Sequence, residues 1–113
     1  MFWLPGFSDP TVKSMLAAVP PPGYELIPEL SDEFDGSELD SSKWTTDPNL
    51  IGWPGRAPGL FDPSNVIVAD GTLQLWAQAA KRNDSWPIGF DNYTTSAIHS
   101  FARVNQGYFE IRY

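Results

Sequence analysis

Three features are missing from this 113-residue sequence, and each absence excludes a class of protein. There is no cysteine, so no disulfide framework can support the fold. Lysine and arginine number 7 against 14 aspartates and glutamates, and the formal net charge of −7 argues against nucleic-acid binding, which needs a basic face. No apolar run reaches the length of a membrane span, so we expect no membrane partner.

The first 22 residues differ in character from the rest of the chain. Residues 1–6 have neither a basic region nor a continuous apolar run, so we expect no signal peptide in this chain. Residues 8–10 resemble a helix start, and the Pro-rich residues 20–23 would end that helix. The sequence therefore predicts an N-terminal helix and Pro-rich linker over residues 1–22, followed by one domain over residues 23–113.

Aromatic residues, proline and glycine are abundant instead. Aromatic residues make up 14% of the chain, and 11 prolines and 9 glycines favour short strands joined by turns. The order of apolar and turn-forming residues predicts an edge strand over residues 24–30, a helical turn over 40–44 that buries Trp44, and a loop over 45–64. A hairpin follows over residues 65–77, with its turn at Asp70-Gly71. The rest of the chain is predicted to form a polar loop over residues 81–90 and strands over 93–101 and 107–113. This is an all-β chain with one leading helix.

The last predicted strand reaches the final residue, Tyr113. Residues 107–113 alternate apolar and polar positions, and no turn residue or polar tail follows them. We therefore expect a strand edge without a partner in this chain, and such edges favour aggregation or pairing with another chain.

A run of carboxylates early in the domain permits three interpretations. A calcium loop with Gly36 at its sixth position would place Ser31 first and Ser42 twelfth, where carboxylates are required, so that interpretation fails. Residues 33–38 match Glu-x-Asp-x-x-Glu, a spacing that suits acid/base and nucleophilic chemistry, but their middle is a turn. The third interpretation is a solvated turn that positions Trp44.

Residues 52–61 form the second group of interest. Trp53 offers a flat face for a sugar ring, and Arg56 offers a planar fork for carboxylate or sulfate esters. Alternatively, Trp53 anchors the loop to the core and Arg56 pairs with a nearby acid. His99 is the only histidine, and without a second metal ligand we expect a hydrogen-bonded packing residue or a contact on a ligand face.

Taken in order, several segments resemble the first part of glycoside hydrolase family 16. The matching segments are Ser31 to Gly36, Leu39 to Trp44, Trp53 to Arg56, Pro63 to Val66, Asp70 to Leu75, Tyr93 to Ile98 and Gly107 to Arg112. The resemblance covers about residues 24–113 and well under half of a whole family domain.

The resemblance implies a jelly-roll β-sandwich, concanavalin-like, whose concave face binds polysaccharide. A jelly roll has about eight strands and the sequence predicts about five, so we expect the β-sandwich to be incomplete in this chain. It implies retaining, endo-acting hydrolysis by two carboxylates ~5 Å apart, on galactans such as agar, porphyran or carrageenan. The catalytic strand of the family follows the segment that resembles residues 107–112, so we expect it beyond Tyr113. No catalytic residue transfers to this chain, which should be inactive alone. Trp53 and Arg56 resemble a loop that borders the non-reducing side of the cleft.

The resemblance also has implications for cofactors and location. No cofactor is required, but many members bind one structural calcium through backbone carbonyls, and Glu33 and Gly71 fall at the matching places. The family implies an extracellular or periplasmic location. The alternative to an enzyme fragment is a non-catalytic carbohydrate-binding module, in which Trp53 and Arg56, with Trp76 or Trp86, hold a glycan.

Overall fold

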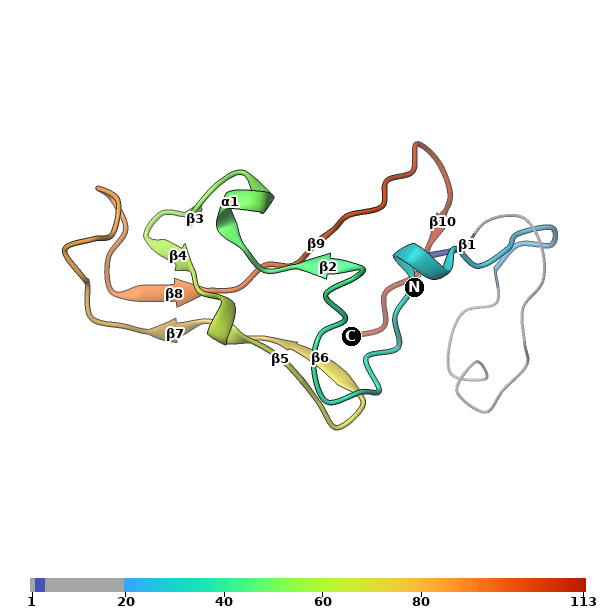
Figure 1. Cartoon of the computed structure of the whole chain (residues 1–113), viewed down its shortest axis with the longest axis horizontal. Helices are drawn as coiled ribbons and strands as arrows, with labels where there is room; N and C mark the ends of the chain where they lie inside the picture. The colour runs from blue at the N-terminus through green and yellow to red at the C-terminus, as the bar shows by residue number, and fades with distance from the viewer. Residues whose placement is uncertain (1, 4–19) are drawn as a thin grey trace. The chain divides into compact units, whose positions relative to one another are not determined.

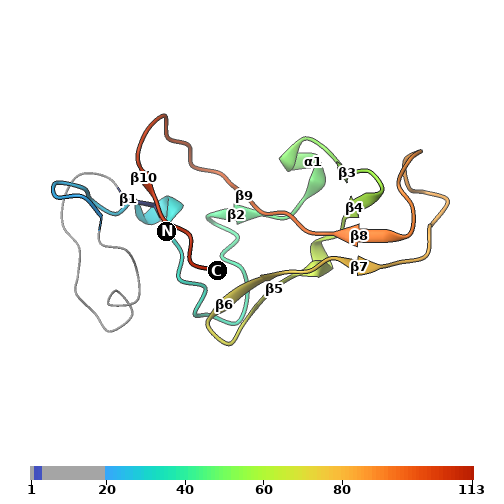
Figure 2. The same cartoon turned by 180° about the vertical axis from the view of Figure 1, so that it is seen from behind.

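The computed structural model describes residues 2–3 and 20–113 (Figures 1 and 2). These residues fall into two compact units. Among the described residues, the first unit consists of residues 2–3, 20–33 and 102–113, and the second of residues 34–101. The predicted N-terminal helix lies outside the described residues. Within the described residues, no helix is long and apolar enough to cross a membrane.

The first unit is built on one short antiparallel pair of strands. β1 (Phe2–Trp3) pairs with β10 (Tyr108–Phe109), and Trp3 lies opposite Tyr108. The Tyr24 ring packs against the Tyr108 ring edge to face, with the centroids 6.4 Å apart. The strand predicted over residues 107–113 is therefore confirmed only at β10.

The strand predicted over residues 24–30 is wrong. Its second half is a 3-10 helix, η2 (Pro28–Leu30), in which Leu30 is buried. The physical reason is Pro28, which has no N–H for a strand ladder and whose fixed φ suits the first position of a helix. The Ser31 N–H closes the turn on the Pro28 carbonyl at 3.2 Å.

The second unit contains most of the strands. Its four-stranded sheet has the order β3-β4-β8-β7, in which β4 and β8 are parallel and the other pairs antiparallel. Two further antiparallel pairs are β2 with β9 and β5 with β6. The strands are β2 (Trp44–Thr45), β3 (Gly55–Arg56), β4 (Gly59–Phe61), β5 (Val66–Ala69), β6 (Thr72–Leu75), β7 (Gln78–Ala79), β8 (Tyr93–Thr95) and β9 (His99–Ser100). The predicted all-β class is confirmed.

Two turns of the second unit agree with the sequence prediction. Asp70 and Gly71 have φ of 54° and 72°, as a two-residue hairpin turn requires, and they connect β5 to β6. At the other turn, the Asp40 carboxylate accepts hydrogen bonds from the Ser42 hydroxyl and N–H at 2.6 and 2.9 Å. These bonds lower the pKa of Asp40. The turn leads directly into Trp44, which is buried beside the Phe34 ring.

The predicted loop over residues 45–64 contains more structure than the sequence indicates. It holds α1 (Pro48–Ile51), the strands β3 and β4, and the start of η3 (Pro63–Asn65). Both helices begin with Asp-Pro: the Asp47 carboxylate accepts from the Asn49 N–H, and the Asp62 carboxylate from the Ser64 N–H, each at 2.9 Å. The two Asp-Pro pairs are thus local helix signals that the prediction missed.

Asn65 connects the elements of the second unit. It is completely buried, and its side-chain N–H₂ donates to the Thr94 hydroxyl at 3.0 Å and to the Thr95 carbonyl at 3.1 Å. Its side-chain oxygen accepts from the Gln78 amide, and its backbone carbonyl accepts from the Trp76 N–H at 2.9 Å. One residue therefore ties η3 to β8, to β7 and to the end of β6.

We expect Asn65→Ala to lower the free energy of unfolding by about 2–4 kcal/mol, because it removes the hydrogen bonds to the buried Thr94 hydroxyl, to the Thr95 carbonyl and from the Gln78 amide. Urea denaturation followed by tryptophan fluorescence measures this loss. The matched control is Asn105→Ala at an exposed position, where a change of less than about 0.5 kcal/mol is expected. Equal losses in the two variants would contradict the role assigned to Asn65.

Candidate functional site

Trp53 is positioned by the end of α1. Gly52 ends this helix with φ of 96°, and its N–H bonds the Pro48 carbonyl at 2.9 Å. The Trp53 ring then packs edge to face on Phe61, with the centroids 5.2 Å apart, and 50% of Trp53 stays exposed. The residue is therefore both anchored and accessible, and half of its surface is open to a ligand.

Arg56 lies at the end of β3, in a tight connection to β4. The connection contains the cis Ala57–Pro58 bond, and Arg56 is opposite Gly59 in the ladder. Gly55 must be glycine, because its φ is 133° and a Cβ would lie 2.4 Å from the Gly59 carbonyl oxygen. The Arg56 side chain is exposed, and over residues 20–113 it forms no ion pair, so the predicted alternative of a nearby acidic partner is not realised there.

The sheet register brings Tyr93 to the same face as Arg56. Gly59 is opposite Arg56 on one side and Tyr93 on the other, and Tyr93 is opposite Ala79. Paired residues of a sheet point to the same side, and so do residues two apart. We call this side, which carries Arg56, Phe61, Ala79, Tyr93 and Thr95, the Arg56 face. The opposite side carries Thr94 and Gln78 and covers Asn65.

Sequence reasoning did not single out Tyr93. The alternation of residues 93–95 shows that Tyr93 and Thr95 share a face, which is a local signal. Its neighbour in space is β4, a parallel partner more than thirty positions earlier in the chain, and no local pattern reports such a pairing. Half of Tyr93 is exposed, as for Trp53.

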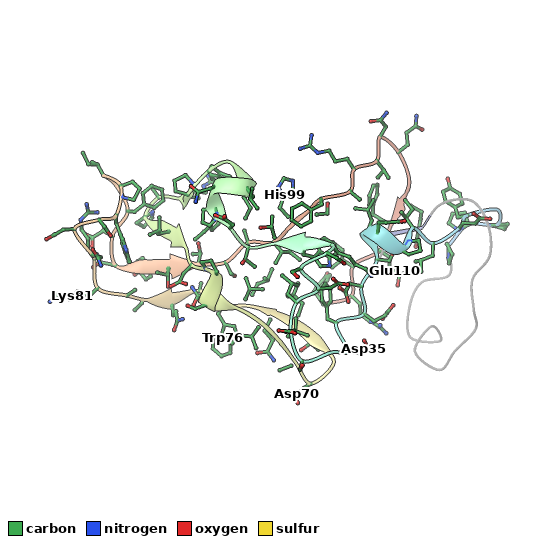
Figure 3. All side chains as sticks on the ribbon, in the orientation of Figure 1. Asp35, Asp70, Trp76, Lys81, His99 and Glu110 are labelled. Atoms are coloured by element: carbon green, nitrogen blue, oxygen red, sulfur yellow. The ribbon has the colours of Figure 1, made fainter. Side chains whose placement is uncertain are left out.

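The other aromatic candidates lie elsewhere in the second unit. Trp76 is half exposed at the end of β6, and its indole N–H donates to the Gln74 side chain at 3.1 Å (Figure 3). Trp86 is half-buried in the loop before β8, where the Arg82 guanidinium donates to its carbonyl at 3.0 Å. Neither residue belongs to the four-stranded sheet that carries Arg56.

His99 is half-buried in β9, opposite Thr45. The hydrogen bond predicted for its ring has no counterpart among the residues that the structure describes. An open pocket of about 350 Å³ lies in the same unit, and its lining residues are Leu39, Ser41, Trp44, Thr45, Thr46, Asp47, Pro63, Val66 and Phe101. His99 is not among these residues, and its role as a packing residue or as a ligand contact stays a prediction.

The carboxylates of residues 33–38 are not arranged on a strand. Glu33 ends the first unit and forms a half-exposed ion pair with Arg112 at 3.4 Å. Asp35 and Glu38 are exposed in the second unit, where residues 36–38 form a bend. A catalytic pair needs a rigid strand to fix its spacing, so the geometry favours the interpretation as a solvated turn.

The residues predicted to bind calcium do not form a site by themselves. Calcium takes about six to eight oxygen ligands. Glu33 and Gly71 would supply one backbone carbonyl each, and Gly71 lies exposed at the hairpin turn. Within the described residues, no group of three or more acidic, histidine or cysteine side chains could hold a metal ion. A calcium site therefore stays a prediction that needs further ligands.

For this chain alone, we expect removal of calcium with EGTA to leave the melting temperature unchanged, because two carbonyls cannot supply a calcium coordination shell. Thermal unfolding with EGTA and with excess calcium measures this, and magnesium serves as the control ion. A rise in melting temperature with calcium but not with magnesium would show that the chain provides the missing ligands.

Comparison with known families gives a match over residues 24–113. The matching family model is described as the glycoside hydrolase family 16 domain of β-porphyranases A–D. The chain is 38% identical over 99 residues to β-porphyranase D of Zobellia galactanivorans, covering 82% of this chain and 23% of that protein. It is 32% identical over 96 residues to β-porphyranase E of the same organism, covering 81% of this chain and 32% of that protein.

Solved structures give the same result. The crystal structure of porphyranase B from Zobellia galactanivorans matches with a TM-score of 0.58 and 30% identity, over 71% of this chain and 29% of that one. The β-porphyranase BpGH16B from the human gut bacterium Bacteroides plebeius matches with a TM-score of 0.55 and 28% identity, over 66% and 26%. The strands described above thus form part of a jelly-roll β-sandwich, and the chain spans about a quarter of the length of β-porphyranase D.

Proposed function

The chain belongs to the β-porphyranase A–D domain family of glycoside hydrolase family 16, and we propose that it forms the N-terminal part of an endo-acting, retaining hydrolase of red-algal galactans. The family match over residues 24–113 carries this proposal. Porphyran is the first candidate substrate, because the relatives are named β-porphyranases, and agar and carrageenan are the alternatives. The proposal includes an extracellular or periplasmic location, where such polysaccharides are met.

The proposed reaction needs two carboxylates about 5 Å apart, one as nucleophile and one as general acid. Within residues 24–113, the spacing Glu-x-Asp-x-x-Glu occurs at residues 33–38, and these lie on a bend rather than on a strand. We therefore assign the catalytic pair to a strand outside this chain. The role of residues 24–113 is to supply part of the sandwich and part of the substrate-binding surface.

Trp53 and Arg56 are the proposed binding residues of this surface. The exposed half of the indole presents an apolar face, on which a sugar ring can stack. The guanidinium three residues later is exposed and free to bind a sulfate ester or a sugar hydroxyl through its planar fork. Gly52 and Gly55 allow the left-handed backbone on either side of Trp53, and the contact with Phe61 holds the Trp53 ring in place before a ligand arrives.

The purified 113-residue chain should release no reducing sugar from porphyran, agarose, carrageenan or laminarin, because none of the strands in the described part of the chain carries a carboxylate pair. A reducing-sugar assay with a full-length β-porphyranase as positive control measures this. Activity that disappears in Glu33→Gln or Glu38→Gln, but not in the exposed control Glu29→Gln, would overturn the assignment and give residues 33–38 the catalytic role.

The same chain should bind porphyran, and both Trp53→Ala and Arg56→Gln should weaken this binding about threefold to tenfold. Affinity electrophoresis in gels containing porphyran measures the change. Added salt should reduce the effect of the arginine substitution more than that of the tryptophan substitution, because only the former removes a charge. Trp76→Ala, at a tryptophan of equal exposure, is the matched control; a loss of affinity there instead would place the sugar on the β5–β6 hairpin.

A non-catalytic carbohydrate-binding module is the second candidate function. The observation that favours it is the pairing of a half-exposed indole with an unpaired guanidinium among the described residues, which is enough for binding without hydrolysis. The two candidates differ in the coding sequence past Tyr113. An apolar strand with Glu-x-Asp-x-x-Glu there favours the enzyme, and a stop codon favours the module.

A further inference from the structure

We infer that the polysaccharide-binding surface continues from Trp53 and Arg56 to Tyr93 and Lys81, with Tyr93 as a second sugar-stacking residue and Lys81 as a second contact for an anionic group. This inference rests on the proposed function and extends it to residues of β8 and of the segment after β7. Its occupant is a galactan chain that carries sulfate esters.

The first support is the register of the four-stranded sheet. Arg56, Gly59 and Tyr93 form one row across β3, β4 and β8. Neighbouring strands are about 4.8 Å apart, so the backbones of Arg56 and Tyr93 are separated by about 10 Å. The residue between them has no side chain, and a Cβ on Gly59 would lie only 2.7 Å from the Thr95 methyl group. No long side chain of β4 therefore rises between the two.

The second support is the composition of the Arg56 face. Trp53 packs on Phe61, Phe61 is opposite Thr95 in the ladder, and Thr95 is two residues from Tyr93. Trp53 and Tyr93 are each about half exposed, at 50% and 51%. The rings thus lie at the two ends of one apolar strip, which suits a ligand longer than one sugar ring.

The third support is the charge at this end of the sheet. Lys81 lines an open depression of about 440 Å³ together with Tyr93, and the other lining residues are Ala79, Ala80 and Asn92. Figure 3 shows Lys81 beyond β7, at the end of the sheet where β8 begins. The Lys81 ammonium is exposed and, within the described ranges, has no ion-pair partner.

The segments that form this end are basic relative to the rest of the chain. Residues 55–61 and 78–95 carry Arg56, Lys81 and Arg82 against Asp84 and Asp91, whereas the whole chain has a net charge of −7. The Arg82 guanidinium is occupied by the loop carbonyls, including that of Pro87 at 3.2 Å, which leaves Arg56 and Lys81 for a ligand. Two free cations beside two exposed rings complement a sulfated sugar chain better than a neutral one.

The test is affinity electrophoresis of the 113-residue chain with porphyran and, as the neutral galactan, agarose. Tyr93→Thr removes the ring but keeps a β-branched residue in β8, and it should weaken binding to both polysaccharides about threefold to tenfold. Tyr93→Phe should bind as the parent does, because the ring face makes the contact. The matched control is Tyr113→Thr, the same change at a fully exposed tyrosine, which should have no effect.

Lys81→Gln should weaken binding to porphyran about threefold and leave agarose binding unchanged, and the loss should shrink as salt is added. Circular dichroism of each variant checks that the sheet is retained. If Trp53→Ala loses affinity while Tyr93→Thr and Lys81→Gln bind as the parent does, the inference is wrong and the proposed function stands. If the parent chain binds neither polysaccharide, the proposed binding function fails and the inference fails with it.

Discussion

The buried amide of Asn65 is the interaction on which the second unit depends. Its backbone lies in η3, while its side chain reaches the Thr94 hydroxyl, the Thr95 carbonyl and the Gln78 amide. A buried amide destabilises the fold unless its donors and its acceptor all have hydrogen-bond partners. The elements around Asn65 must therefore adopt one arrangement that supplies all of these partners. The strands of this unit have only two to four residues each, and short ladders alone would not fix their relative positions.

The Asn65 network and the Arg56 face are opposite sides of the same strands. Thr94 points to Asn65, so its neighbours Tyr93 and Thr95 point to the other side of β8. A shift of one residue in the pairing of β8 would move Tyr93 inward and break the hydrogen bonds of Asn65. The network that holds the unit together therefore also determines which side chains are available to a ligand.

Glycine and proline residues determine the backbone that positions Trp53 and Arg56 at the Arg56 face. Asp47 and Pro48 begin a single helical turn, and Gly52 ends it with a left-handed conformation. At Gly55 the close approach of the Gly59 carbonyl excludes any side chain. The proline and glycine content of this segment predicts a loop without regular structure, yet a helix start, a helix end and a close backbone contact constrain its backbone at these positions.

Local sequence determined the all-β class, the Asp70-Gly71 hairpin and the turn that buries Trp44, because each depends on residues close together in the chain. Trp53 and Arg56 are candidates by residue type, and their binding role stays a prediction. The sequence places Pro28 in a predicted edge strand, although its missing N–H and fixed φ suit a helix start equally well, and the folded chain forms the 3-10 helix there. The parallel pairing of β4 with β8, the burial of Asn65 and the position of Tyr93 on the same face as Arg56 were decided by tertiary structure alone. The residue pattern of a strand indicates which side chains share a face, but it does not indicate which distant segment pairs with that strand. Such pairings are therefore visible only in the folded chain.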